Sequence, residues 1–166
     1  GVSLNEFLPD PASDWDGDGA ASAEDEYIEL YNAADVTVDL SGWLLDDEDD
    51  GLIGQSARPE GTRPYVIPDG ATIGPRGFLV FYRSQTGVAL NNDSDSVRLL
   101  WPDGRVVESY DYNVVRDEAP FSKMTDGGNV WTTSYPPSPG APNRPGYTPD
   151  DVVRINEVLA SPRDFD

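Results

Sequence analysis

Short segments in which apolar and polar residues alternate, separated by turn-forming residues, dominate this chain of 166 residues. Residues 2–8 and 26–32 alternate in this way, which is typical of strands with one buried face. Residues 78–83 are apolar on both faces and predict a central strand, whereas a Pro-Asp-Gly turn between residues 97–101 and 105–112 indicates a hairpin. No window has sustained helical periodicity. Together these patterns predict an all-β fold, an antiparallel β-sandwich.

The first predicted strand carries one carboxylate in an unfavourable place. Strict alternation puts Glu6 on the face that also carries Val2, Leu4 and Leu8, where an unpaired charge is costly. Two interpretations follow. Either Glu6 lies at the strand end beside the acidic loop that comes next, or it contributes a ligand or a supporting contact to that loop.

The acidic stretch at residues 14–25 matches the spacing of a calcium-binding loop. Asp14, Asp16 and Asp18 occupy positions 1, 3 and 5, and Gly19 occupies position 6, where such a loop turns sharply. Carboxylate oxygens at alternate positions suit one hard cation such as Ca²⁺. The predicted metal ligands are Asp14, Asp16, Asp18, the backbone carbonyl of Ala20 at position 7, and Asp25 at position 12.

The end of this loop leaves alternatives open. Helix–loop–helix calcium sites prefer Glu at position 12, whereas this chain has Asp25 flanked by Glu24 and Glu26, and Ser22 at position 9 acts directly or through water. No amphipathic helix flanks the loop, so it is not an EF-hand. The competing interpretation is a solvated acidic turn, because Asp-Gly dipeptides bend without a metal. Calcium is favoured because so many carboxylates in one short loop repel one another unless a cation neutralises them.

The composition excludes several classes of function. Thirty-one acidic and eleven basic residues give a net charge of −20, which repels phosphate, so direct binding of nucleic acid is not expected. The chain has no Cys and no His, which excludes disulfides, zinc sites built from thiolate or imidazole, and catalysis by either side chain. The longest apolar run, residues 78–82, is far shorter than a bilayer span, so membrane insertion is not expected.

The end of the chain restates its beginning. Residues 153–166 (VRINEVLASPRDFD) match residues 2–16 (VSLNEFLPDPASDWD) apart from one deleted residue. We therefore expect a domain over residues 1–143, a Pro- and Gly-rich linker over residues 144–152, and the truncated first strand of a second copy over residues 153–166. Because a strand without its sheet has unpaired backbone groups, residues 152–159 are expected to add to a sheet edge and to support a strand-exchange oligomer.

Five segments occur in the order seen in bacterial lamin-tail domains. They are residues 4–7 (LNEF), 25–32 (DEYIELYN), 40–45 (LSGWLL), 90–99 (LNNDSDSVRL) and 137–143 (PSPGAPN). The chain resembles this family over residues 2–143, and the resemblance implies an immunoglobulin-like β-sandwich without catalytic activity. Such domains occur in secreted or surface proteins, often in tandem or beside nucleases, phosphoesterases or other hydrolases.

The chain also departs from the nuclear relatives of that family. No heptad pattern of a coiled-coil rod is present, so filament assembly and a nuclear location do not carry over. The acidic loop is absent from the eukaryotic members. The calcium role therefore rests on the loop spacing and not on the resemblance.

One function is favoured over three alternatives. We expect a non-catalytic module of an extracellular or cell-surface bacterial protein, with structural Ca²⁺, that contacts a protein or polysaccharide surface or positions an attached hydrolase domain. The first alternative is a carbohydrate-binding module that uses exposed aromatic side chains. Its candidate residues are Trp15, Tyr27, Tyr31, Tyr110 and Tyr112. The second is an accessory part of an extracellular nuclease or phosphoesterase, and the third is an enzyme with a carboxylate pair, although no pair stands out in the sequence.

Overall fold

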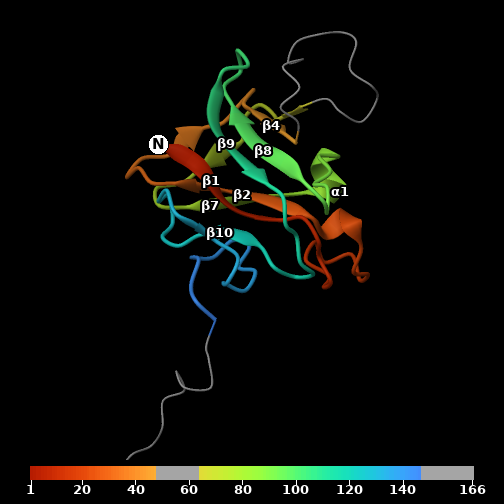
Figure 1. Ribbon diagram of the computed structural model, residues 1–166. Helices are drawn as coiled ribbons and strands as arrows, with labels where there is room; N and C mark the ends of the chain where they lie inside the picture. Colours follow the sequence, from red (N-terminus) through yellow and green to blue (C-terminus); the bar gives the residue numbers. More distant parts are fainter. Residues whose placement is uncertain (48–63, 147–166) are drawn as a thin grey trace, which may run out of the picture.

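The computed structural model describes residues 1–47 and 64–146 and shows a sandwich of antiparallel sheets (Figure 1). The five-stranded sheet has the order β11 (Trp131–Thr132), β10 (Phe121–Lys123), β1 (Val2–Leu8), β2 (Tyr27–Asn32) and β7 (Phe78–Tyr82). The four-stranded sheet has the order β5 (Tyr65–Val66), β4 (Leu44–Asp46), β8 (Asp95–Leu100) and β9 (Val106–Tyr112), and β3 (Val38–Asp39) pairs with β6 (Thr72–Ile73). The predicted all-β antiparallel sandwich is confirmed.

Helical structure is scarce in the described part of the chain. It consists of the 3-10 turn η1 (Ala23–Asp25) and the single-turn helix α1 (Arg83–Thr86). Among the described residues, no helix has the length and apolar character needed to cross a membrane.

Apolar side chains from the two large sheets meet in one core. Its fully buried members include Leu4 and Leu30 from one sheet and Leu45 and Leu99 from the other. Burial of each such side chain contributes roughly 1.5–3 kcal/mol. Trp43 is buried in the same core. Phe7 of β1 stacks on Phe121 of β10 with ring centroids 4.9 Å apart, so the short strand β10 is also tied to the core.

A β-bulge in β1 changes which side chains face the core. The register between β1 and β2 shifts between Leu4 and Glu6, which makes Asn5 the extra residue. Phe7 therefore joins Leu4 in the core, and Glu6 turns to the opposite face of the sheet. The prediction from strict alternation, which put Glu6 on the face of Leu4, is wrong because it assumed a regular strand.

Glu6 is fully buried on that opposite face and accepts four hydrogen bonds. Its Oε1 accepts from the Tyr27 hydroxyl (2.5 Å) and from the Ser138 backbone N–H (2.8 Å). Its Oε2 accepts from the Ser122 hydroxyl (2.7 Å) and the Ser138 hydroxyl (3.0 Å). These bonds offset the cost of burying a carboxylate. Neither role predicted for Glu6 accounts for these four hydrogen bonds. Both predicted roles placed Glu6 beside the acidic loop, whereas its partners belong to β2, β10 and residue 138.

Residues 136–143, here called the C-terminal strap, cover the outer face of the five-stranded sheet. The backbone N–H of Gly140 donates to Oε2 of Glu29 (2.6 Å), and the Asn143 side chain donates to the backbone carbonyls of Asn5 (3.1 Å) and Lys123 (3.0 Å). The strap is therefore part of the packed domain. Residues 147–166, with most of the predicted linker and the predicted second copy, lie outside the described residues, so the domain boundaries and the strand exchange stay predictions.

Two strands of the five-stranded sheet differ from the sequence prediction. Residues 78–83 are predicted as a central strand, but β7 lies at one edge of this sheet, so that prediction is wrong. Its outward-facing residues Phe78 and Tyr82 pack against Tyr31 and Tyr27 of the neighbouring strand, which explains why both of its faces are apolar. The sequence pattern gives no signal for β10, because three residues are too few to show a period of two.

The substitution Glu6→Ala should lower the free energy of unfolding by about 3 kcal/mol or more, because the buried hydroxyl groups of Tyr27 and Ser122 lose their acceptor. Urea unfolding followed by circular dichroism measures this change. The matched control is Glu24→Ala, which removes an exposed carboxylate and should change the free energy of unfolding by less than about 0.5 kcal/mol. A Glu6→Ala protein as stable as the wild type would contradict the role given to Glu6.

Candidate functional site

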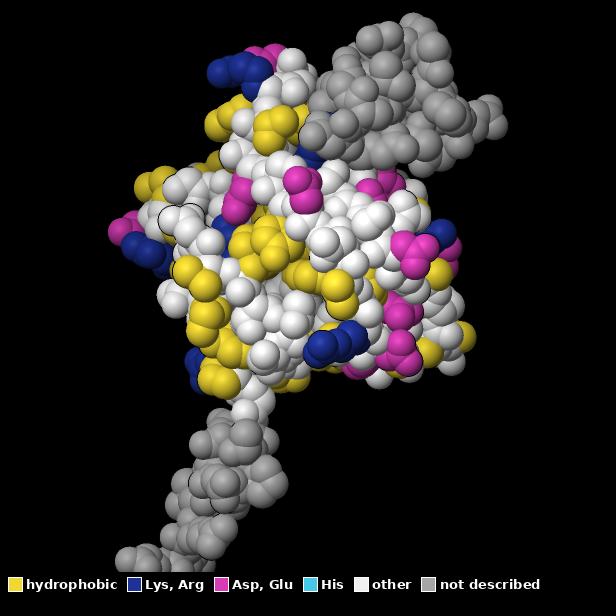
Figure 2. Space-filling view, in the orientation of Figure 1, with side chains coloured by type: hydrophobic (Ala, Val, Ile, Leu, Met, Phe, Trp, Pro, Cys, Tyr) yellow, Lys and Arg dark blue, Asp and Glu magenta, His cyan; other side chains and the backbone are white. Residues whose placement is uncertain are grey.

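Three Asp carboxylates gather in the loop between β1 and η1. Asp14, Asp16 and Asp18 each offer one oxygen, and these oxygens lie within 4.8 Å of one another. Asp14 and Asp18 are exposed, and Asp16 is half-buried. Figure 2 shows acidic side chains gathered on the side of the molecule where Figure 1 places this loop. The structure thus brings together three of the five predicted metal ligands in a cluster that can hold a metal ion.

Two glycines let the loop close around the first of these carboxylates. The backbone N–H groups of Gly17 and Gly19 donate to the two oxygens of Asp14, at 2.8 and 2.9 Å. Both glycines have left-handed backbone conformations, with φ of 81° and 99°. A residue with a Cβ adopts such conformations only at a cost, so glycine at these positions favours the curved loop.

The other two carboxylates form similar short turns. Oδ1 of Asp16 accepts from the N–H of Asp18 (3.0 Å), and Oδ1 of Asp18 accepts from the N–H of Ala20 (2.8 Å). None of the ion pairs within the described residues involves Asp14, Asp16 or Asp18. Their mutual repulsion is therefore not offset by a neighbouring Lys or Arg in that part of the chain. The backbone carbonyl of exposed Ala20 stays a predicted ligand.

Asp25, the fifth predicted ligand, is fully buried and braces the loop from within the domain. Its Oδ1 accepts from the N–H groups of Trp15 (2.6 Å) and Asp16 (2.9 Å), and its Oδ2 accepts from that of Ser22 (2.8 Å). Burial acts to raise the pKa of Asp25, but these three bonds outweigh it, so that the pKa lies below the usual 3.8. Asp25 is not part of the three-Asp cluster, and its role as a ligand stays a prediction.

Glu118 anchors the other side of the loop. Its Oε1 accepts from the Trp15 indole N–H (2.9 Å), and its Oε2 accepts from the Ala12 N–H (2.5 Å). The Glu118 N–H in turn donates to the carbonyl of Asp10 (2.8 Å). Nothing in the sequence signals this role, because Glu118 is more than a hundred residues away from its partners. The start of the acidic loop is thus fixed to the segment between β9 and β10.

Two further carboxylates near the loop have other partners. Glu26 is buried and accepts hydrogen bonds from the Arg83 guanidinium (2.7 Å) and from the Leu90 N–H (2.7 Å). These two bonds hold its carboxylate away from the three-Asp cluster. Glu24 is exposed and lies 3.9 Å from the same Arg83.

The aromatic residues considered for carbohydrate binding have different fates. Tyr27 and Tyr31 are buried and cannot form an exposed platform. Tyr112 is also buried, but it is among the residues that line a surface pocket. Trp15 is half-buried and its indole N–H is bonded to Glu118. Tyr110 is half-buried and lines a surface pocket.

A second group of carboxylates is enclosed beneath the C-terminal strap. Glu29 is fully buried and accepts from the Asn5 side chain (2.9 Å) and from the Gly140 N–H (2.6 Å), and Asp126 accepts from the same Asn5 side chain (3.1 Å). Burial raises the pKa of Glu29 to about 8; these hydrogen bonds oppose the rise, and repulsion from Glu6 and Asp126 adds to it. Because the strap covers these acids and supplies one of their hydrogen bonds, we interpret them as structural residues that hold the strap on the sheet.

Comparison with known families gives one match. The model of a family described as Lamin Tail Domain matches residues 1–114, a stretch that runs from β1 through β9. No curated protein matches the chain. The strands β10 and β11 and the C-terminal strap lie beyond the match, although they extend the five-stranded sheet and cover its outer face.

The raised pKa of Glu29 predicts that the domain loses stability as the pH rises. The folded state holds this proton up to about pH 8, whereas an unfolded Glu releases it near pH 4.5, so the free energy of unfolding decreases across this range. Burial also raises the pKa of Asp47 to about 6, so measurements between about pH 6.5 and 8 report mainly on Glu29. Urea unfolding over this interval should give a smaller slope for Glu29→Gln than for the wild type. Equal slopes would show that Glu29 does not hold the proton.

Proposed function

The chain belongs to the lamin tail domain family, whose members are immunoglobulin-like domains without catalytic activity. On this premise, we propose that the chain is a structural module of a secreted or cell-surface bacterial protein. Its role is to contact a protein or polysaccharide surface or to position an attached hydrolase domain. A calcium ion bound by the acidic loop stiffens the connection between β1 and β2.

The observation that carries this proposal is the convergence of Asp14, Asp16 and Asp18. Their oxygens lie within 4.8 Å of one another, and Asp16 and Asp18 each follow the previous ligand by two residues. Alternate carboxylates followed by a glycine turn are the arrangement that surrounds one cation in calcium loops. The close approach of three negative charges favours a bound cation over an empty loop.

The chemistry of the donors favours calcium over other metals. All candidate ligands offer oxygen, and the chain has neither Cys nor His, which transition metals and zinc prefer. Mg²⁺ requires a near-ideal octahedron and keeps several waters, whereas Ca²⁺ accepts an irregular set of oxygens. Exposed sites of extracellular modules typically have dissociation constants of about 10⁻⁴ to 10⁻³ M, and such a weak site fills only where calcium is abundant. A weak calcium site therefore supports the proposed location outside the cell.

The surroundings of the loop support a structural role for the ion. Asp25 and Glu118 already hold the Trp15 region by hydrogen bonds, so the exposed tip at residues 16–20 is the part that an ion would fix. An ion that neutralises Asp14, Asp16 and Asp18 binds the folded loop and not the unfolded chain. Binding of this kind stabilises the whole domain.

Calcium should therefore raise the melting temperature of the wild-type domain. At about 5 mM Ca²⁺ and a dissociation constant of about 10⁻⁴ to 10⁻³ M, the stabilisation is about 1–2 kcal/mol, which corresponds to a rise of about 2–8 °C. Differential scanning calorimetry with and without calcium measures this rise.

The double variant Asp16→Asn with Asp18→Asn should abolish the rise, because it removes two charges yet keeps the oxygens that accept the turn hydrogen bonds. The matched control Asp35→Asn with Asp103→Asn removes two charges from exposed positions elsewhere and should respond like the wild type. A wild-type domain that calcium does not stabilise would disprove the metal role.

A further inference from the structure

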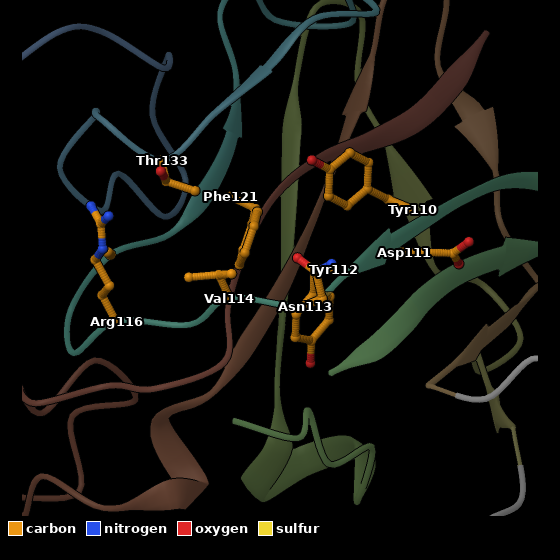
Figure 3. A pocket seen from close by; sticks show the side chains of 9 residues that line it. Tyr110, Asp111, Tyr112, Asn113, Val114, Arg116, Phe121 and Thr133 are labelled. Carbon is orange, nitrogen blue, oxygen red and sulfur yellow. The ribbon is translucent and has the colours of Figure 1, made fainter. Parts of the chain in front are cut away.

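A pocket of about 170 Å³ opens where β9 ends and the chain turns toward β10. Figure 3 shows Tyr110 and Asp111 on one side of it and Arg116 and Thr133 on the other, with Phe121 and Val114 between them. Pockets for drug-sized ligands span about 300–1,000 Å³. This pocket is therefore matched in size to a single small ring.

The floor of the pocket is apolar and fixed in place. Phe121 is 6% exposed and stacks on a core ring, and Tyr110 packs against Trp131 with ring centroids 4.6 Å apart. Tyr112 is held through its hydroxyl group, which donates to the carbonyl of Asn91 (3.0 Å). The side chain of Val114 is exposed beside them. Rigid aromatic surfaces of this kind bind apolar faces with little loss of side-chain entropy.

The rim of the pocket carries unused hydrogen-bonding groups. The rim side chains are Asp111, Asn113, Arg116 and Thr133, and none of them has a hydrogen-bond or ion-pair partner among residues 1–47 and 64–146. Other exposed arginines behave differently, since Arg76 pairs with Asp35 (2.9 Å) and Arg105 pairs with Asp103 (2.7 Å). The guanidinium of Arg116 and the amide of Asn113 are thus available to a ligand.

We propose that this pocket binds one neutral hexopyranose unit of a polysaccharide. A sugar ring presents C–H groups on its faces and hydroxyl groups around its edge, which complements an apolar floor with a polar rim. Asp111 and Arg116 lie on opposite sides and balance each other in charge, and the net charge of −20 repels polyanions, so the ligand is neutral. This site names the ligand class for the proposed contact with a polysaccharide surface and rests on that part of the proposed function, but it does not depend on the calcium loop.

Titration of the ¹⁵N-labelled protein with methyl glycosides of glucose, galactose and mannose, followed by NMR, tests this assignment. At least one of these sugars should shift the backbone amide signals of residues 110–116 and 133 in a saturable way, with a dissociation constant of about 1 mM. Methyl glucuronide, which adds a negative charge to the same ring, should bind more weakly.

Two variants connect the binding to the pocket. Arg116→Ala and Asn113→Ala change exposed side chains and should each weaken the binding by about tenfold while the remaining signals keep their positions. Arg105→Ala, which removes an exposed arginine from the β8–β9 turn, should leave the affinity unchanged. The proposal is overturned if no neutral glycoside shifts these signals, if both pocket variants bind like the wild type, or if the glucuronide binds most tightly.

Discussion

The buried carboxylate of Glu6 joins parts of the domain that lie far apart in the sequence. It accepts hydrogen bonds from Tyr27 of β2, Ser122 of β10 and Ser138 of the C-terminal strap. This is only geometrically feasible because the bulge at Asn5 turns Glu6 away from the core while Phe7 enters it. A buried carboxylate without such partners would cost several kcal/mol. The strap is therefore needed to stabilise buried Glu6, and Glu6 in turn holds the strap in position.

The acidic loop contains carboxylates in two different arrangements. Asp25 and Glu118 use their oxygens to accept N–H groups at the start of the loop, whereas Asp14, Asp16 and Asp18 converge without a basic neighbour among the described ion pairs. The first arrangement is complete within the protein, whereas for the second we propose a bound cation as the missing partner. Because Glu118 belongs to the segment that also lines the pocket with Arg116 and Ala119, the loop and the pocket share one support.

Local patterns in the sequence were sufficient for the sandwich, the β8–β9 hairpin and the three clustered Asp residues, because alternation, turn residues and ligand spacing are all short-range signals. They failed where long-range contacts decide the structure. The bulge at Asn5 serves the hydrogen bonds of Glu6, the edge position of β7 depends on packing against β2, and Glu118 meets Trp15 only after folding. The pocket combines residues of β9, of β10 and of the segment between them with Thr133, which follows β11, so no single stretch of sequence displays it.

The proposed binding of calcium by the acidic loop can be tested by a crystal structure of the domain grown in calcium chloride. We expect one ion with six to eight oxygen ligands at about 2.3–2.6 Å, including oxygens of Asp14, Asp16 and Asp18. An ordered loop without an ion at these three side chains, in crystals that contain millimolar calcium, would contradict it.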